Sequence, residues 1–573
     1  MAVKHLLTSE GEKLLESLRE DPSYIPWKQY PRPQLYRDSF LCLNGQWTFC
    51  TCSPEQAHQE TILVPYPPES RLSGICRNLG KDPDVYYRRS FRLPEGFRKD
   101  RVILHFGAVD QIARIVLNGY EIGTHCGGYD SFSLEITEHI LYENILEVYV
   151  SDRLSDGILP YGKQRYKRGG MWYTPITGIW QSVWLESVPE VYIRELQITN
   201  TLDTVTIQAE GIDAADVEIE TPDGNLISHM HNGKVRFEIP NPRNWTPDDP
   251  YLYYFTVRTE SDAVRSYFAL RTLETAVVNG IPRICLNGKP IFLHGLLDQG
   301  YYSDGIYTPA SPESYTNDIL AMKAMGFNTL RKHIKVEPEH FYFECDRLGM
   351  LVIQDMVNNG RYSFIRDTAL PTIGFKKMPD RRMHNHRKQR KTFVDSAERT
   401  IRQLQNHPCI CCWTIFNEGW GQFDSTVMYE SLRGLDKSRI IDTASGWFNG
   451  GKSDLESIHV YFKPVKIKSS PKPVLLSEFG GYSCCVPEHA YQPDKSYGYR
   501  LFTDRNKFAE ALFRLYKDEI APIIASGLCG AIYTQVSDVE DETNGLLTYD
   551  RKICKIDVEV MKNISRILYN SIQ

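Results

Sequence analysis

Two glutamates that follow long apolar runs form a candidate catalytic pair. Glu418 follows the run CICCWTIF and its neighbour Asn417, and Glu478 closes the run PVLLS. Two carboxyl groups on either side of a bound sugar can cleave a glycosidic bond: one protonates the leaving oxygen, and the other attacks the sugar carbon or activates water. A glutamate after a strand is commonly just a solvated loop residue. The two glutamates therefore indicate catalysis only if the fold brings both side chains to the same place.

The second half of the chain predicts such a fold. After about residue 273, apolar strands alternate with amphipathic helical segments. We expect strands over 290–297, 327–335, 350–356, 409–416, 439–445, 456–461, 473–479 and 528–536. Eight strands with helices between most of them indicate a (β/α)₈ barrel, the TIM barrel fold, whose active sites lie at the carboxyl ends of the strands. Glu418 and Glu478 stand at the ends of the fourth and seventh of these strands.

The other predicted strands also end in polar or aromatic side chains. Any single one of these has a structural alternative, such as a core contact or an ion pair, so the argument rests on their convergence at one face. The candidate ligand-binding residues at these ends are Asn417, His294, Asp298, Arg331, His333, Trp447, His459, Tyr461 and Gln535.

Three further segments precede the barrel. Residues 1–35 contain a helix over 8–19, capped by Thr8 or Ser9, and an irregular lead-in. Residues 36–188 consist of short alternating strands, with a hairpin at Asn118-Gly119, and predict a jelly-roll β-sandwich. Residues 189–272 contain about seven short strands and predict an immunoglobulin-like β-sandwich without a disulfide. The barrel takes up 273–573.

Composition excludes several classes of protein. The 573 residues carry 66 Lys and Arg against 72 Asp and Glu, so no global basic field attracts nucleic acid. No apolar run approaches a membrane span, and the first residues lack the apolar core of a signal peptide. We therefore expect a cytoplasmic protein with reduced cysteines. Cys409, Cys411 and Cys412 belong to no quartet of Cys and His at the spacing of a zinc site, so we expect them to be core residues. No metal or cofactor is expected.

Several motifs together resemble glycoside hydrolase family 2, the β-galactosidase and β-glucuronidase group. They are WTIFNEG, LLSEFGG, GFNTLRKHI, GGYDSFSLEIT, TGIWQSVWLE and FLHGLLDQGYYSDGIYTP. The resemblance implies that Glu418 is the general acid/base, that Glu478 is the nucleophile, and that the mechanism retains the anomeric configuration through a glycosyl-enzyme. It also implies a Tyr beside the nucleophile, here Tyr461, and exo action. Where many members carry a Trp on strand eight, this chain offers Tyr533 or Gln535.

The nature of the sugar is less determined. Family members specific for glucuronic acid carry an Asn-x-Lys motif after the last strand, and the corresponding stretch VSDVEDETNGLLTYDRKICK lacks it. This favours a neutral β-galactoside or a related oligosaccharide as substrate. The basic segment 376–391 and the cations Lys332 and Lys335 keep a β-hexuronide as the alternative. A non-catalytic carbohydrate-binding protein is the remote alternative, and a homo-oligomer is compatible with the sequence.

Overall fold

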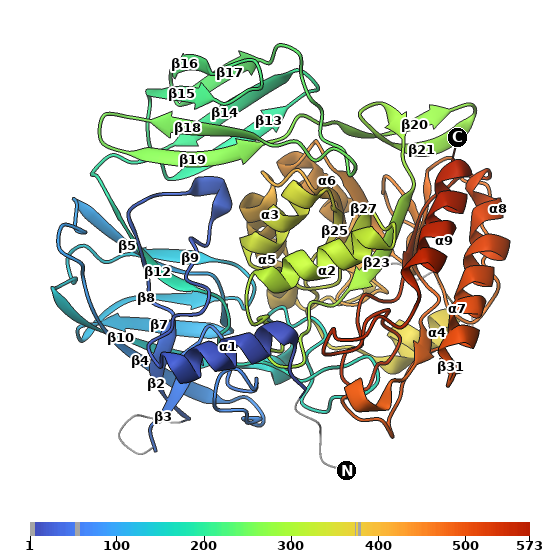
Figure 1. Ribbon diagram of the computed structural model, residues 1–573, viewed down its shortest axis with the longest axis horizontal. Helices are drawn as coiled ribbons and strands as arrows, with labels where there is room; N and C mark the ends of the chain where they lie inside the picture. The colour runs from blue at the N-terminus through green and yellow to red at the C-terminus, as the bar shows by residue number, and fades with distance from the viewer. Residues whose placement is uncertain (1–5, 52–57, 373, 376–379, 573) are drawn as a thin grey trace.

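The computed structural model describes residues 6–51, 58–372, 374–375 and 380–572. It begins with helix α1 (Ser9–Glu20), which lies beside the jelly-roll sandwich and the barrel (Figure 1). The Thr8 side chain accepts a hydrogen bond from the Gly11 N–H, which identifies Thr8 as the N-cap of the predicted helix. The Thr8 hydroxyl also donates to Asp304 of the barrel at 2.6 Å. The cap thus ties the start of the chain to the catalytic half.

The predicted jelly roll is present as two packed antiparallel sheets. One has the order β1 (Phe40–Cys42), β12 (Val183–Val188), β5 (Arg101–Phe106) and β9 (Phe132–Glu135). The other has the order β3 (Glu60–Val64), β2 (Gly45–Thr51), β4 (Asp84–Arg92), β10 (Glu143–Ser151), β7 (Ile112–Leu117) and β8 (Tyr120–Cys126). A short ribbon pairs β6 (Val109–Asp110) with β11 (Gly178–Ile179). Asn118 and Gly119 both have positive φ, as the predicted hairpin requires.

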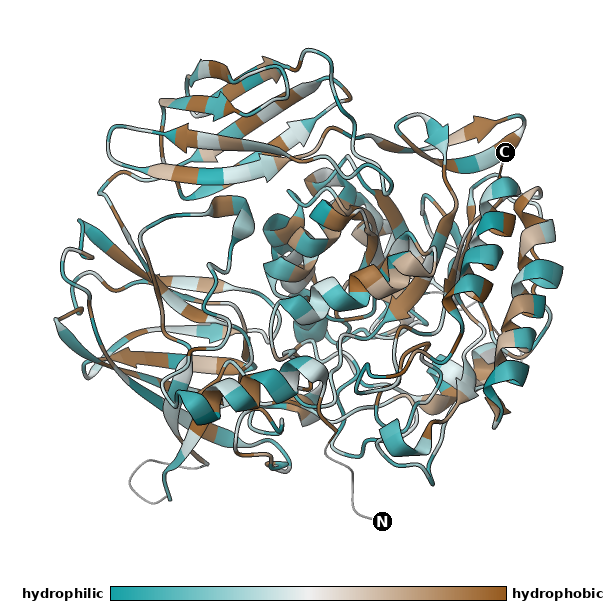
Figure 2. Ribbon diagram, viewed as in Figure 1, coloured by the Kyte–Doolittle hydropathy of each residue, from teal (hydrophilic) through white to brown (hydrophobic). Residues whose placement is uncertain are grey.

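The immunoglobulin-like sandwich follows and lies above the jelly roll in Figure 1. Its sheets are β13 (Glu195–Asn200), β14 (Thr204–Glu210) and β17 (Lys234–Glu238), and β16 (Leu226–Met230), β15 (Ala215–Ile219), β18 (Tyr253–Arg258) and β19 (Ala263–Phe268). Buried and exposed residues alternate along β15 and β17, because each sheet turns one face to the core and one to solvent. The alternation is visible as brown and teal bands (Figure 2).

The barrel contains all eight predicted strands. Each observed strand lies inside its predicted range or passes its end by one residue. They are β23 (Leu293–Asp298), β24 (Thr329–Lys332), β25 (Leu351–Asp355), β26 (Ile410–Asn417), β27 (Ile440–Ser445), β28 (Glu456–Val460), β29 (Val474–Phe479) and β32 (Leu528–Tyr533). Seven parallel ladders join them, and β27 contacts β28 to close the ring. A meander of β20 (Leu273–Val278), β21 (Ile281–Leu286) and β22 (Lys289–Pro290) precedes the ring.

Helices surround this ring. The longer ones are α2 (Glu313–Ala324), α3 (Glu339–Leu348), α5 (Arg387–Leu404), α6 (Ser425–Leu435), α7 (Arg505–Arg514) and α9 (Val558–Asn570), and the short ones α4 (Leu370–Thr372) and α8 (Ala521–Ile524). A two-stranded ribbon, β30 (Tyr482–Cys484) with β31 (Arg500–Phe502), follows strand seven. None of the described helices combines the length and the apolar character that a membrane span requires.

The structure places two features of the sequence, the cysteines before Glu418 and the basic segment, within the barrel. Cys409, Cys411 and Cys412 are buried at or in β26, as expected of core residues. Part of the basic segment, 376–379, lies outside the described residues, and the rest runs into α5. There Arg390 forms an ion pair with Asp424 at 2.7 Å.

The jelly roll supplies one wall of the barrel mouth. Its segment 161–174 leaves the sandwich and contacts the loops that follow the barrel strands. The Tyr161 hydroxyl donates to the Gly360 carbonyl at 2.8 Å, and the Thr174 N–H donates to Glu540 at 2.9 Å. Arg168 forms an ion pair with Asp541 at 3.2 Å. These contacts fix the segment, named here the jelly-roll arm, over the carboxyl ends of the strands.

Candidate active site

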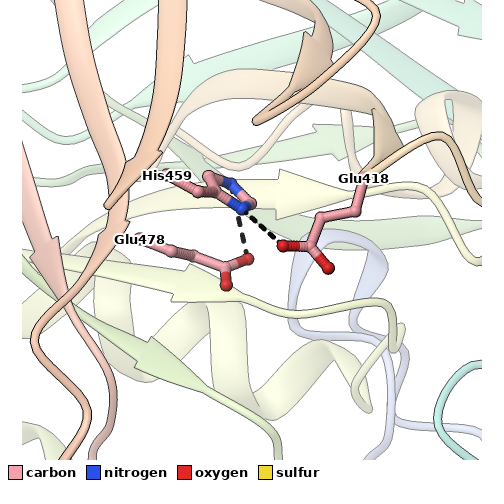
Figure 3. A group of neighbouring side chains, drawn as sticks. All are labelled: Glu418, His459 and Glu478. Atoms are coloured by element: carbon pink, nitrogen blue, oxygen red, sulfur yellow. Dashed lines mark hydrogen bonds and ion pairs between the residues drawn. The ribbon is translucent and has the colours of Figure 1, made fainter. Parts of the chain in front are cut away.

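The two predicted carboxylates face each other across the barrel mouth. Glu418 follows β26, Glu478 lies in β29, and His459 of β28 lies between them (Figure 3). One carboxylate oxygen of each glutamate and one ring nitrogen of the histidine all lie within 4.8 Å of one another. His459 Nδ1 is 2.9 Å from Glu418 Oε1, and its Nε2 is 3.6 Å from Glu478 Oε1. The two strands therefore deliver their acids to one small volume.

A fully buried arginine organises the floor of this volume. Arg331 of β24 forms two bonds with Asp355 and donates to Glu478 Oε1, each at 3.0 Å. It also donates to the Asn417 side-chain oxygen and to the Ser477 carbonyl, again at 3.0 Å. A guanidinium has five N–H donors in a fixed fork, so one side chain can set the positions of groups on several strands. Because Arg331 only donates, the Asn417 amide must turn its oxygen to Arg331 and its nitrogen away.

Glu478 is held in its ionised form. Burial alone would raise its pKa, but the charges of His459 and Arg331 outweigh burial and lower the pKa to about 2. The Tyr461 hydroxyl, 2.5 Å from Glu478 Oε2, acts in the same direction because it donates to the charged form. Tyr461 itself stacks on Tyr499 with ring centroids 3.8 Å apart. Glu478 is thus an anion with both oxygens occupied by donors.

His459 connects the acids to a buried hydroxyl cluster. Its Nε2 is 3.0 Å from the Ser445 hydroxyl, which is 2.8 Å from the Ser477 hydroxyl. Ser457 closes the cluster at 2.7 Å from Ser477. These serines belong to β27, β28 and β29, so the hydroxyl that holds the imidazole is itself fixed by groups from three strands. Such fixed orientation is what a side chain between two reacting acids needs.

The backbone at the two glutamates is unusual in a way that suits the site. Glu418 has φ +51°, a left-handed conformation that non-glycine residues rarely adopt and that clusters at functional sites. After Glu478 the chain turns through Gly480 at φ +78°, where an added Cβ would lie 2.3 Å from the Tyr533 ring. Glycine is therefore required there for the loop to pass over strand eight.

Most of the predicted ligand-binding residues gather at this mouth. Asn417, Arg331, His459 and Tyr461 all contact one of the two glutamates or each other, as described above. His333 hydrogen-bonds Asp355 at 2.7 Å and so joins the Arg331 network. Trp447 packs against His459 edge-to-face with centroids 5.5 Å apart.

Four other predicted residues lie elsewhere. The prediction for His294 is wrong: it is the second residue of β23, and its fully buried ring stacks on Phe327 near the amino-terminal end of the strand. Asp298 reaches the correct end, but its carboxylate pairs with Lys332 at 2.6 Å and caps the Gly300 N–H. Its position beside Lys332 reflects strand alternation: Arg331 points into the barrel, and the next residue points out.

The side chains of Tyr533 and Gln535 bond to neighbouring segments of the chain, not to the two glutamates. The fully buried Tyr533 accepts from the Tyr482 N–H at 3.1 Å. Gln535, also fully buried, donates to Asn544 at 2.9 Å, which in turn donates to Glu542. Lys332 and Lys335 are the cations that the sequence offers for binding a uronate carboxylate. Both instead form ion pairs with Glu337, at 2.8 and 2.9 Å.

The structure adds residues that the strand-end analysis did not select. Trp172 of the jelly-roll arm stacks on Trp420 at 5.3 Å and meets Tyr362 edge-to-face at 5.0 Å. These rings form an aromatic wall beside Glu418, whose charge raises the pKa of Tyr362 after the larger effects of burial and a bond to Thr368. Lys163 lies against Trp420, 5.1 Å from its ring centroid, and Glu542 accepts a hydrogen bond from Tyr173 of the same arm. Two of the added residues carry a signal in the sequence: Trp420 comes two residues after Glu418, and Trp172 stands in the stretch GGMWYTPITGIW.

Comparisons with known proteins agree with this architecture. Three family models match successive parts of the chain. The model of the glycosyl hydrolase 2 galactose-binding domain-like region matches 76–170, that of glycosyl hydrolases family 2 matches 191–271, and that of the family 2 TIM barrel domain matches 278–480. The three regions are those of the jelly roll, the immunoglobulin-like sandwich and the barrel.

Individual relatives are more distant. A β-galactosidase from Thermoanaerobacter pseudethanolicus is 27% identical over 387 residues, covering 62% of this chain and 47% of the relative. A β-glucuronidase from Felis catus is 23% identical over 445 residues, covering 68% of this chain and 65% of the relative. The chain thus spans about half to two thirds of the length of these curated relatives.

Solved structures match over nearly the whole chain. A β-D-glucuronidase of Dictyoglomus thermophilum superposes with a TM-score of 0.73 at 18% identity, covering 94% of this chain and 98% of the other. A GH2 β-galacturonidase of Eisenbergiella tayi bound to galacturonate gives 0.68 at 19% identity, covering 94% and 99%. At such identities the likeness establishes the fold.

Replacing Tyr461 with Phe tests the electrostatics of Glu478. The variant keeps the ring and its stacking but removes the donor to the ionised carboxylate. A hydrogen bond to a charged group contributes about 1.5–3 kcal/mol. The pKa of Glu478 should rise, and the acidic limb of kcat/KM against pH should move up by about one pH unit, because the ionised form is then lost at higher pH.

Tyr482→Phe is the matched control, since its hydroxyl bonds Arg500 and not Glu478. It should leave the acidic limb where it is in the unmodified protein. A Tyr461→Phe profile that coincides with that of the control would contradict the assigned interaction.

Proposed function

Because the chain belongs to glycoside hydrolase family 2, we propose that it is a retaining exo-β-glycosidase that hydrolyses terminal β-linked hexosides by a two-glutamate double displacement. One observation carries the proposal: one carboxylate oxygen of Glu418 and one of Glu478 lie within 4.8 Å of each other. Retaining enzymes place their carboxyl groups about 5–5.5 Å apart, whereas inverting enzymes leave about 6.5–9.5 Å for a water molecule. The short separation supports direct attack by one acid.

In the first half-reaction Glu478 attacks the anomeric carbon. Its low pKa keeps it ionised at neutral pH. As the bond between its oxygen and the anomeric carbon forms, the bond to the leaving oxygen breaks, and that oxygen takes a proton from Glu418. In the second half-reaction Glu418 removes a proton from water, the water oxygen attacks the anomeric carbon, and Glu478 leaves as a carboxylate. The sugar departs with its original configuration.

The residues around the pair have matching tasks. With its oxygen held by Arg331, Asn417 offers its amide nitrogen to the sugar 2-hydroxyl, a contact that strengthens in the transition state. Trp172, Trp420 and Trp447 supply flat apolar faces for sugar rings. The jelly-roll arm lies across the mouth and supports exo action, because it limits the space beyond the terminal sugar.

Two sugars are candidates, and the sequence motifs favour a β-galactoside. It follows from the missing Asn-x-Lys motif, and it gains support from the engagement of Lys332 and Lys335 by Glu337, which leaves neither cation for a substrate carboxylate. A β-hexuronide is the second candidate. It is favoured by the glucuronidase and galacturonidase that the fold matches and by a glucuronidase among the relatives.

A panel of nitrophenyl β-glycosides tests both the reaction and the sugar. We expect release of nitrophenol from a β-galactoside or a β-hexuronide, and a preference of at least about 100-fold in kcat/KM for one class. Nuclear magnetic resonance of the first product should show the β anomer, because the mechanism retains configuration. Purified protein that hydrolyses none of the panel, or that releases the α anomer first, would contradict the proposal.

Replacing Glu418 with Ala separates the two catalytic roles. An activated nitrophenyl group leaves without help from an acid, so its departure should slow far less than that of an alkyl glycoside. We expect kcat/KM for the alkyl glycoside to fall by about 10³ or more and that for the nitrophenyl glycoside by about tenfold, within the range of general acid catalysis. Equal losses on both substrates would count against Glu418 as the acid.

A further inference from the structure

Lys163 of the jelly-roll arm is a buried cation without an anionic partner. Its side chain is 7% exposed. The ammonium lies 5.1 Å from the centroid of the Trp420 ring and 5.9 Å from that of Tyr173. Among the residues that the structure describes, no carboxylate oxygen lies within 4.0 Å of it, and its nitrogen forms no hydrogen bond. Two aromatic rings therefore flank an ammonium whose side chain is largely buried.

The neighbouring cations are in a different situation. Arg331 bonds Asp355 and Glu478, Lys332 bonds Asp298, and Lys335 bonds Glu337. Arg168, on the same jelly-roll arm, pairs with Asp541. Taking a cation out of water is costly unless an anion or a set of acceptors replaces the water. Lys163 departs from this pattern and is more buried than Arg165, which stacks on Trp172, and than the exposed Lys167, the other cations of the arm without a carboxylate partner among the described residues. This indicates that the partner of Lys163 arrives from outside.

Electrostatic coupling places Lys163 on the nucleophile's side of the mouth. Burial lowers the pKa of His333, the bond to Asp355 raises it, and the charge of Lys163 acts in the same direction as burial. This charge also opposes the burial that raises the pKa of Glu542. The charge of Glu478 acts on the same two residues in the opposite direction. The contacts agree: Lys163 lies against Trp420, whose ring centroid is 6.4 Å from that of His333, and against Tyr173, whose hydroxyl donates to Glu542.

Glu542 is close enough to be influenced by Lys163 but does not pair with it. One of its carboxylate oxygens accepts from the Tyr173 hydroxyl, and the other accepts from Asn544 at 3.0 Å. Both oxygens are therefore occupied by donors from the protein. The ammonium therefore keeps its three donors for a ligand.

We propose that Lys163 is the specificity-determining residue of the sugar site and binds the carboxylate of a terminal β-hexuronic acid. The inference rests on the proposed function, since it names the sugar on which Glu418 and Glu478 act. A carboxylate would complete the missing ion pair through a short charge-assisted bond, and the aromatic rings on the other side would exclude water from it. A neutral sugar offers only hydroxyl oxygens, which compensate a buried charge less.

A purely structural role is the opposing interpretation, in which Lys163 serves only to hold the jelly-roll arm against Trp420 by a cation–π contact. The two interpretations differ in what removal of the charge does. A substrate anchor affects uronides and spares neutral sugars. A structural contact affects all substrates alike, through the position of the arm.

The experiment compares Lys163→Met, Lys163→Arg and the control Lys167→Met, which removes a charge from an exposed position of the same arm. Each variant and the unmodified chain is assayed on nitrophenyl β-galacturonide, β-glucuronide and β-galactoside. Binding of free galacturonate, glucuronate and galactose is measured by calorimetry on the same samples, after circular dichroism has verified the fold.

We expect the unmodified chain to prefer one of the two uronides over the galactoside. Lys163→Met should lower kcat/KM for that uronide by about 100-fold and change that for the galactoside by less than about threefold. Lys163→Arg should retain most of the uronide activity, and Lys167→Met should behave as the unmodified chain. Equal losses on all substrates, or a uronide activity that survives Lys163→Met, would overturn the inference.

The binding data separate this inference from the proposed function. An unmodified chain that binds a free uronate through Lys163 but hydrolyses no glycoside refutes the proposed function and supports the anchor. A chain that hydrolyses β-galactoside and binds uronate no better than galactose keeps the function and overturns the anchor. If Lys163→Met does not fold, an unmodified chain that binds uronate no better than galactose still overturns the anchor.

Discussion

The bonds of one buried guanidinium hold the candidate site together. Arg331 has no contact with solvent, and it is surrounded by Asp355, Glu478, Asn417 and the Ser477 carbonyl, which come from three other strands of the barrel. A buried cation is stable only when anions and acceptors surround it, and the two anions are stable only because the cation is there. The charge that fixes the geometry also keeps Glu478 ionised. Position and reactivity therefore have the same physical origin.

The barrel brings these side chains to one point, and the jelly-roll arm covers them. Parallel strands buried on both faces let β24, β25, β26 and β29 end at the same level. The barrel alone would leave this end open to water. The jelly-roll arm covers part of it with Trp172 and Lys163, and its bonds to Gly360, Glu540 and Asp541 tie the cover to the loops after the strands. Exclusion of water strengthens the electrostatic interactions beneath.

Much of this arrangement could be predicted from the sequence, because it depends on local patterns. Apolar runs closed by polar residues marked all eight strands and both glutamates, and the alternation of short strands marked the two sandwiches. His294 and Asp298 failed for reasons that pattern alone cannot resolve. One stands at the wrong end of its strand, and the other faces outward, where Lys332 takes its charge. Lys163 and Glu542 were missed because they reach the mouth from loops, where no periodicity predicts direction.

In the proposed mechanism Glu478 forms a covalent bond with the sugar. The most direct measurement is to incubate the protein with a 2-deoxy-2-fluoro β-glycoside of the sugar it hydrolyses and to locate the adduct by mass spectrometry of the digested chain. The electronegative fluorine slows both half-reactions, and an activated leaving group restores only the first, so the intermediate accumulates. The account predicts one added fluorosugar on the peptide that contains Glu478. An adduct on any other residue would contradict it.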